Sequence, residues 1–351
     1  MKIYFGIDEN DCFNPYVSIL IKRLKEIDDT LEVVSGIQTF WNEEILSCNI
    51  IHIHWPDILL KNTNRTPEDL KLRLQAIKEK GGKIVATCHN VKPHFAKFPW
   101  QTEAYTVVYE LCDMILHMGN YSQNLFKELY PRSRHEILPH HIYDDRYKDP
   151  VTKEEAAKKL GLSTKYTYIL CLGAFRDQQE RDLLLGLTDF LKKNSIKILA
   201  PSFFIERKTK GIRIYLRHAK TKLKCLLLNL LHNIKTSAKI IPEEEIPLFG
   251  AMADLMLLQR VVILNSGNAS MGFYLGKVVV GPDTGNVGPF LKESGNPVFE
   301  VGSKESLISS IKEGLAQAAA GYGQKNKTYA QRHLSSKTIS RQLLDFYKSL
   351  L

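Results

Sequence analysis

The chain alternates short apolar runs with longer stretches in which apolar positions recur every three or four residues. Short runs are typical of buried strands, and the longer recurrence is typical of helices with one buried face. Because parallel strands need crossover helices between them, the alternation predicts an α/β protein with parallel sheets. The strands predicted in the first half are Lys2–Gly6, Leu31–Val34, Ile50–Ile53, Lys83–Thr87, Met114–His117 and Glu136–Leu138. The helices predicted between them include Tyr16–Ile27, Pro67–Lys80 and Tyr121–Leu129.

The pattern breaks near residue 150 and then begins again. Thr152 stands three residues before Glu155, a spacing that predicts a capping box for a helix running towards Leu160. The strands predicted in the second half are Tyr166–Leu172, Ser195–Ala200, Ala238–Ile240, Asp254–Leu258 and Val278–Val280. The predicted helices are Gln178–Lys193, Glu243–Ala251, one after Gly267, Lys304–Ala316 and Ser336–Leu351.

Two α/β halves of similar size in 351 residues indicate two domains, since a domain commonly holds roughly 100–200 residues. We assign 1–150 to the first domain, 151–330 to the second and 331–351 to a closing helical segment. Open parallel sheets bind ligands outside the carboxyl ends of their strands, so we expect a cleft between the two sheets. No apolar run resembles a signal peptide or approaches the roughly 20 residues of a membrane-spanning helix. A cytoplasmic location is therefore expected.

The composition is that of an ordinary folded protein, with 44% hydrophobic and 25% charged residues, which argues against disorder and collagen-like repeats. The six cysteines lack metal-binding spacing, so we expect them to be reduced and mostly buried. The net charge of +10 is concentrated in one segment, because Glu206–Lys239 holds ten cations and one anion. The rest of the chain is close to neutral, which argues against a nucleic-acid-binding protein.

Histidines follow two of the predicted strands in the first half. His89 comes two residues after the strand Lys83–Thr87 ends, where an imidazole can bind a hydroxyl or phosphate oxygen or transfer a proton, or can simply be structural. His52 and His54 fall on one face of their strand. Together with His89 and His94 they suggest a metal site, but the carboxylates or cysteines usual at zinc sites are missing. Polar lining of the cleft or packing against the strand is the preferred interpretation.

Two segments of the second half are suited to phosphate. Arg176 follows a strand and precedes a helix, where a guanidinium and a helix N-terminus can bind a diphosphate together. The alternative for Arg176 is an exposed ion pair with Glu180. Small residues at Ser266–Ser270 and a glycine-rich turn at Asp283–Gly288 allow backbone amides to approach a phosphate closely. The alternative is a pair of ordinary turns with capping side chains.

Taken together, these segments resemble the bacterial nucleotide-sugar glycosyltransferases of the GT-B fold, nearest to glycosyltransferase family 4 enzymes of polysaccharide assembly. The resemblance covers nearly the whole chain and rests on Val85–His89, on Ile241–Phe249 leading to Ala253–Asp254, and on Leu275–Lys277 through Asp283–Gly285. It implies two Rossmann-like domains facing a cleft, with a C-terminal helix crossing back to the first domain. It also implies transfer of a hexose from a nucleotide-diphosphate sugar to a glycan hydroxyl, without a metal or another cofactor.

The resemblance implies a role for each matching residue. His89 matches the histidine that contacts the donor sugar and its phosphate. If the enzyme inverts the sugar, Asp8, Asp11 and His94 are the candidates for a base at the acceptor hydroxyl. The residues matching the donor-binding positions are Arg176, Arg181 as a second cation, Glu243 in the segment around the base, Gly267, Asn268, Ser270 and Gly285. The residues matching acceptor-side motifs are Asn14, His54, Asn90 and His140.

The chain departs from the family pattern where two glutamates are usual. Ile263 and Met271 take their places, and neither side chain can bind a sugar hydroxyl, although Asn265, Ser266 or Asn268 are possible substitutes. The usual glycine-rich loop after the first strand is also absent from the sequence. Retention or inversion at the sugar therefore stays open, and two alternative functions remain. They are a GT-B-fold sugar-nucleotide epimerase and a non-catalytic basic binding or scaffold protein.

The basic segment 206–239 is predicted to be an insertion in the second domain, since the family usually crosses this point with a shorter connection. The apolar residues that recur among its cations are Ile212, Tyr215, Leu216, Ala219, Leu223 and Leu226. The pattern predicts a basic amphipathic helix on an anionic membrane surface, with a solvated helical hairpin as the alternative. We therefore expect a peripheral protein at the inner face of the cell membrane, with a lipid-linked acceptor.

Overall fold

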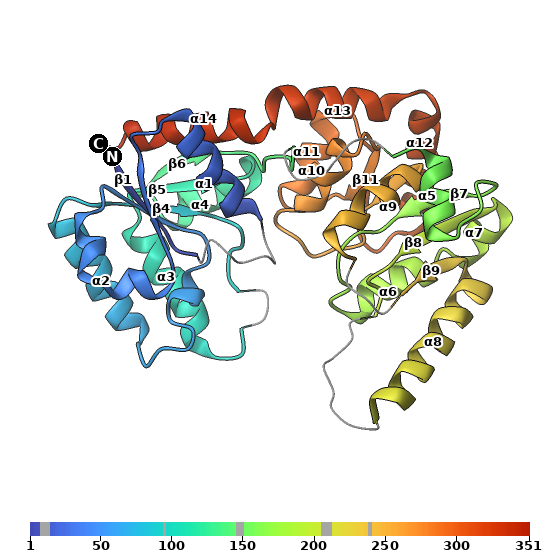
Figure 1. Cartoon of the computed structure of the whole chain (residues 1–351), viewed down its shortest axis with the longest axis horizontal. Helices are drawn as coiled ribbons and strands as arrows, with labels where there is room; N and C mark the ends of the chain where they lie inside the picture. The colour runs from blue at the N-terminus through green and yellow to red at the C-terminus, as the bar shows by residue number, and fades with distance from the viewer. Residues whose placement is uncertain (8–14, 94–95, 145–150, 205–212, 238–240) are drawn as a thin grey trace. The chain divides into compact units, whose positions relative to one another are not determined.

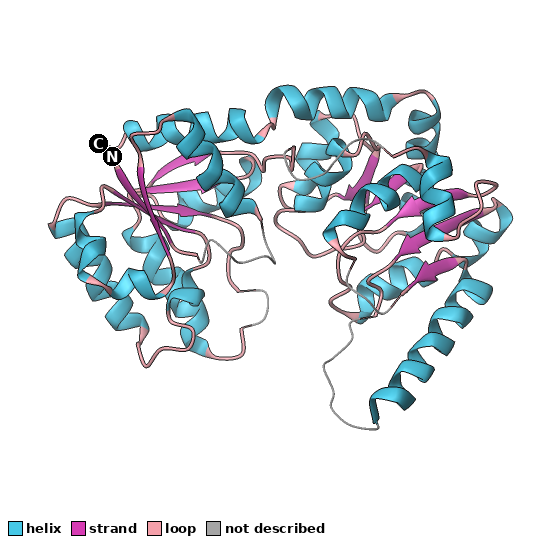
Figure 2. Cartoon of the chain, in the orientation of Figure 1, coloured by secondary structure: helices cyan, strands magenta, loops and turns pink. Residues whose placement is uncertain are grey.

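The computed structural model of the chain contains two compact α/β units (Figures 1 and 2). Unit 1 comprises Met1–His141 together with His333–Leu351, and unit 2 comprises Ile142–Arg332. The residues that the structure describes are 1–7, 15–93, 96–144, 151–204, 213–237 and 241–351. Each unit is built around one sheet of six parallel strands.

The sheet of unit 1 has the strand order β2-β1-β3-β4-β5-β6. Its strands are β1 (Lys2–Phe5), β2 (Glu32–Ser35), β3 (Ile50–Ile53), β4 (Lys83–Thr87), β5 (Met114–His117) and β6 (Arg134–Ile137). All six predicted strands are confirmed, with end shifts of at most two residues. Strands β3 and β5 are buried throughout, which explains why three of the four residues in each are apolar, since helices cover both faces of a parallel sheet.

The helices of unit 1 include one from the far end of the chain. They are α1 (Tyr16–Ile27), α2 (Pro67–Glu79), α3 (Pro99–Leu111), α4 (Asn120–Leu129) and α14 (Ser336–Lys348), with short 3₁₀ helices at Gln38–Trp41, Glu43–Ser47 and Pro56–Leu59. Helix α14 packs on α1, and Arg23 Nε donates to Ser336 Oγ at 2.8 Å. The predicted return of the C-terminal helix to the first unit is thus confirmed.

The sheet of unit 2 has the strand order β12-β11-β10-β7-β8-β9. Its strands are β7 (Thr167–Leu170), β8 (Ile196–Ala200), β9 (Ile234–Thr236), β10 (Leu255–Leu257), β11 (Val279–Pro282) and β12 (Val298–Phe299). The predicted strand Ala238–Ile240 lies outside the described residues. Among the described strands, β9 stands at this edge and pairs with β8 from Ile198↔Ile234 onwards.

The described residues of unit 2 form ten helical segments around this second sheet. They are α5 (Lys153–Leu160), α6 (Gln178–Leu185), α7 (Thr188–Lys193), α8 (Arg213–His232), the 3₁₀ helix η4 (Glu243–Glu245), α9 (Ile246–Met252), α10 (Gly267–Tyr274), α11 (Val287–Glu293), α12 (Lys304–Ala319) and α13 (Tyr322–His333). The capping box of α5 is confirmed, since Thr152 Oγ1 accepts from the Glu155 amide and the Glu155 carboxylate accepts from the Thr152 amide. The single helix predicted over 178–193 is wrong, because it is interrupted after Leu185 and restarts at Thr188.

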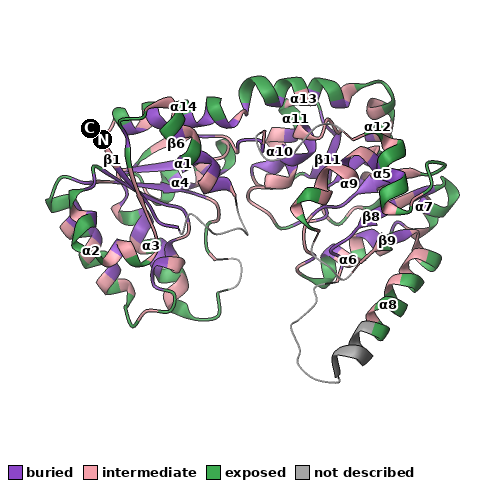
Figure 3. Cartoon of the chain, in the orientation of Figure 1, coloured by how far each residue is buried: buried purple, intermediate pink, exposed green. Residues whose placement is uncertain are grey.

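The strands of both sheets are mostly buried, and the exposed residues lie mainly on helices and loops (Figure 3). The five cysteines within the described residues are free thiols, four of them buried, as predicted. No helix among the described residues combines the length and the apolar character needed to cross a bilayer.

Candidate functional site

Two loops meet at one edge of the sheet in unit 2. Strands β7 and β10 are parallel neighbours, with Leu170 opposite Met256, so their carboxyl ends lie together. The loop after β7 leads to Arg176, and the loop after β10 leads to Arg260. The two loops are bound to each other, because Arg260 Nη2 donates to the carbonyl oxygen of Ala174 at 3.2 Å. This edge is where open parallel sheets bind their ligands.

Glu180 on α6 holds both loops. Its side chain is only 2% exposed, and its two oxygens accept from Arg260 Nε and from the backbone amide of Arg176, each at 3.0 Å. A buried carboxylate needs such partners to offset its lost hydration. The alternative interpretation of Arg176 needed an exposed Glu180, and this is wrong, since Glu180 is buried and forms its ion pair with Arg260.

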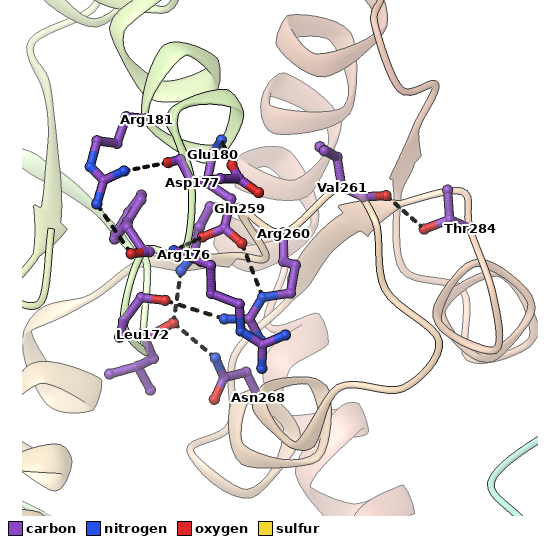
Figure 4. Close-up of polar contacts among 12 residues, drawn as sticks. Leu172, Arg176, Asp177, Glu180, Arg181, Gln259, Arg260, Val261, Asn268 and Thr284 are labelled. Atoms are coloured by element: carbon purple, nitrogen blue, oxygen red, sulfur yellow. Dashed lines mark hydrogen bonds and ion pairs between the residues drawn. The ribbon is translucent and has the colours of Figure 1, made fainter. Parts of the chain in front are cut away.

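Two guanidinium groups come together as a result. In Figure 4, Arg176 and Arg260 reach from the two strand ends toward the same region, beside Asn268. Burial, and next the positive charge of Arg260, lower the pKa of Arg176 to about 10. Two cations that repel each other in a half-buried setting favour an anion that contacts both. We call Arg176 and Arg260 the arginine pair.

The start of helix α10 lies beside the arginine pair. Asn268 Nδ2 donates to the carbonyl oxygen of Leu172 at 2.8 Å, which fixes the first turn of α10 against the loop after β7. Gly173 has a positive φ of 89°, and a Cβ atom there would lie 3.1 Å from Asn268 Nδ2. The backbone amides of a helix start favour bound anions. The structure thus brings Gly267 and Asn268 to Arg176, whereas Ser270 is buried further along α10.

Arg181, the residue predicted to be a second diphosphate cation, binds the loop that carries Arg176. Its guanidinium donates to the carbonyl oxygens of Asp177 at 2.5 Å and Phe175 at 3.1 Å, and lies 5.9 Å from the ring centre of Phe203. These contacts hold the loop that carries Arg176. Arg260 was missed in the sequence, although the signal was the same as for Arg176, namely an arginine shortly after a buried strand.

Gly285 supports the site through its backbone. It has a φ of +54°, and a Cβ atom there would overlap the carbonyl oxygens of Ile263 and Leu264 in the loop that leads to α10. Glu243 lies on η4, between β9 and α9. Met271, which the resemblance aligns with a glutamate, is buried.

We expect Gly285→Ala to lower the free energy of unfolding by about 2–4 kcal/mol, since it adds a steric overlap to an unfavourable φ. Gly302→Ala is the matched control, because Gly302 has a φ of +91° but nothing within 4 Å of an added Cβ atom. Its expected cost is only the backbone strain, about 1 kcal/mol. Urea unfolding of both variants measures the difference, and equal costs would contradict the overlap.

Histidines gather at the corresponding edge of the sheet in unit 1. The rings of His52 and His54 lie 4.2 Å apart, as expected for residues on one face of a strand. His52 is fully buried, with Nε2 bonded to Thr87 Oγ1 at 2.8 Å and Nδ1 to the hydroxyl of Tyr347 on α14 at 2.5 Å. Burial lowers the pKa of His52 to about 3, so this ring is neutral at pH 7. His52 is therefore a structural residue that binds α14 to the sheet.

His54 and His89 form a hydrogen-bonded pair, with 3.0 Å between His54 Nδ1 and His89 Nε2. The ring of Trp55 stacks on His89 at 4.6 Å, and Tyr16 contacts it edge-on at 5.1 Å. Burial is the main cause that lowers the pKa of both histidines well below 6.5. His54 is 1% exposed and lies behind His89, so it positions His89 and is not itself at the surface.

Of the other residues predicted for the site in unit 1, some lie near His89 and some lie outside the described residues. His140 is near His89 through Tyr16, whose ring lies 4.7 Å from the His140 ring. The backbone oxygen of Asn90 accepts from the hydroxyl of Tyr109 at 2.9 Å. Asp8, Asp11, Asn14 and His94 lie outside the described residues. No group of three or more histidine, cysteine, aspartate or glutamate side chains within the described ranges is placed to hold a metal ion.

Comparisons with known proteins locate the fold. No family model matches the chain, and no curated protein matches it by sequence. Sucrose-phosphate synthase from Thermosynechococcus elongatus is similar over 100% of this chain and 99% of its own, with a TM-score of 0.72 and 12% identity. HepE from Anabaena, solved in complex with UDP-glucose, is similar over 99% and 100%, with a TM-score of 0.67 and 15% identity.

A third solved structure, described as a UDP-N-acetylglucosamine 2-epimerase from Listeria monocytogenes, is similar over 99% of this chain and 95% of its own. Its TM-score is 0.58 and its identity is 12%. Identities this low show the fold alone. The predicted fold class is confirmed, since the chain consists of the two Rossmann-like α/β domains of the GT-B fold.

Proposed function

We propose that the protein is a glycosyltransferase that transfers a hexosyl group from a nucleotide-diphosphate sugar to a hydroxyl of a glycan. The observation that carries this proposal is the arginine pair, held by the buried Glu180 beside the start of α10. Guanidinium groups bind phosphate oxygens in pairs of hydrogen bonds, and two of them can contact both phosphates of a diphosphate. The similarity to sugar-nucleotide enzymes of the same fold supports the proposal.

In the proposed reaction, the bond between the sugar C1 and the β-phosphate oxygen breaks, and a bond from C1 to the acceptor oxygen forms. Negative charge grows on the departing diphosphate, and Arg176, Arg260 and the backbone amides of α10 stabilise that charge. No metal is required, because two fixed cations supply this stabilisation. The acceptor proton passes to a base, for which Asp8, Asp11 and His94 are the candidates, or to the diphosphate itself.

The acceptor is proposed to bind in unit 1, at the carboxyl edge of its sheet. His89 supplies a neutral imidazole there, backed by His54 and stacked on Trp55. A neutral imidazole suits hydrogen bonding to sugar hydroxyls. We further propose that the acceptor is a lipid-linked glycan of cell-surface polysaccharide synthesis, reached from the inner face of the cell membrane. The exposed leucines and lysines of α8 support this location.

We expect calorimetry with UDP, GDP, ADP and dTDP to find one nucleotide that binds clearly more tightly than the others. Arg176→Gln should lower the affinity for that nucleotide roughly 10- to 100-fold, the effect of losing a charge-assisted hydrogen bond. The corresponding nucleotide sugar should be hydrolysed slowly when no acceptor is present. Epimerisation of the sugar nucleotide would support the epimerase alternative, and a protein that binds no nucleotide would overturn the proposal.

A further inference from the structure

Helix α8 exposes a row of leucines. The five residues, which we call the leucine stripe, are Leu223, Leu226, Leu227, Leu230 and Leu231, with exposed fractions between 43% and 61%. Their spacing of three and four residues places them on one side of the helix. On most other helices of the described ranges, the large aliphatic residues are buried (Figure 3). Five exposed leucines in nine residues therefore indicate a surface that binds a partner.

The opposite side of α8 packs against the rest of unit 2. Leu228 contacts the core of unit 2, and His232 Nδ1 lies 2.7 Å from the hydroxyl of Thr188 at the start of α7. At about 100° per residue, Leu228 and His232 lie roughly opposite the centre of the leucine stripe. The stripe thus faces away from the sheet to which α8 is attached. In Figure 1, α8 extends beyond β9.

Cations lie along the leucine stripe. Lys220, Lys222 and Lys224 are exposed in the same turns of α8, and no acidic residue occurs between 207 and 239. Two copies of this helix packed by their stripes would bring these lysines together, which costs electrostatic energy. An anionic surface would instead be attracted by them. The lysines therefore favour an anionic partner for the leucine stripe over a second copy of α8.

We propose that the leucine stripe and its lysines form a docking surface for an anionic phospholipid bilayer. The leucine side chains enter the boundary between headgroups and acyl chains, while the lysines remain at the level of the phosphates. Each lysine near an anionic membrane strengthens binding about fivefold, so three together contribute roughly 100-fold. The inference rests on the proposed function at a membrane. The docking surface lies on α8, however, and shares no residue with the arginine pair.

The test is sedimentation of the full chain with vesicles of phosphatidylcholine, alone or mixed with phosphatidylglycerol. We expect binding only to the mixed vesicles and loss of that binding at high salt. The double variant Leu226→Ser with Leu230→Ser should bind at least about tenfold more weakly, because it removes apolar burial and leaves every charge. Changing Lys220, Lys222 and Lys224 to glutamine should weaken binding roughly 100-fold.

Leu129→Ser is the matched control, because Leu129 is 53% exposed on α4 of unit 1 and should leave vesicle binding unchanged. Nucleotide affinity of each α8 variant, measured without lipid, should equal that of the unchanged protein. That measurement separates failure of the docking surface from failure of the proposed transferase. Equal binding of all variants to vesicles, or a stripe-dependent dimer in place of vesicle binding, would overturn the inference.

Discussion

Arg260→Gln is expected to lower the affinity for the preferred nucleoside diphosphate roughly 10- to 100-fold, as Arg176→Gln does. The reason is that both guanidinium groups face the start of α10 and that Glu180 fixes the direction of Arg260. Removing both cations should abolish measurable binding. The diphosphate then loses both guanidinium groups that would contact it, and there is no longer a repulsion between two cations for a bound anion to relieve. Isothermal calorimetry with the nucleotide and no sugar measures this effect without relying on catalysis.

The decisive control is Arg181→Gln. Its guanidinium binds the carbonyl oxygens of Phe175 and Asp177, so we expect a loss of stability with a smaller loss of nucleotide affinity than at Arg260. Arg260→Gln leaves the carboxylate of Glu180 buried without its cation, which is costly. The double variant Arg260→Gln with Glu180→Gln removes that cost and should fold while still binding weakly. Should Arg181→Gln weaken binding more than Arg260→Gln, the sequence-based assignment of the second cation would be correct instead.

Unit 1 is expected to lose stability steeply as the pH falls from about 6.5 toward 3. Burial lowers the pKa of His52 and of His117 to about 3, and both rings are fully buried. Between these pH values the unfolded chain takes up protons that the folded chain does not, so acid favours unfolding. Each histidine contributes about 1.4 kcal/mol per pH unit, so these two together with His140, whose pKa burial also lowers to about 3, contribute about 4 kcal/mol per unit. A stability of about 5–15 kcal/mol would be lost within a few units.

Tryptophan fluorescence can follow this unfolding selectively, because Trp41, Trp55 and Trp100 all lie in unit 1. Urea unfolding at several pH values should give a slope that falls by about 1.4 kcal/mol per pH unit in His117→Leu, which removes one titrating ring. His333→Leu is the control, since His333 is exposed at the end of α13. An unchanged slope in His117→Leu would show that the ring is not held neutral by burial.

The strands were predictable because burial on both sheet faces leaves a short, mostly apolar run. For β3, β4 and β5 the predicted and observed bounds coincide. Helix interruptions were less predictable, as α6 and α7 show. The apolar spacing continues through this region, and only Gly186 marks the place where the helix breaks. That residues following the strands lie near the candidate site was also predictable, since the carboxyl ends of parallel strands meet at one edge of the sheet.

What the sequence did not show was which of these residues contact each other. Arg176 and Glu180 are four positions apart, which suggested a local pair, but Glu180 binds the Arg176 backbone amide and also the guanidinium of Arg260, 80 positions away. That choice depends on the pairing of β7 with β10, which no local pattern contains. In the same way, His54 matched an acceptor motif, but only the structure shows that His89 lies between it and the surface.

The return of α14 to unit 1 has a consequence for how the chain is made. Ile339, Leu343 and Tyr347 belong to the same core as β1 and α1, but they are translated after every residue of unit 2. During synthesis, unit 2 can fold on the ribosome while unit 1 still exposes the apolar surface on which α14 will pack. The half of the protein that begins first is therefore completed last, and that interval is when it is most exposed to aggregation and to chaperones.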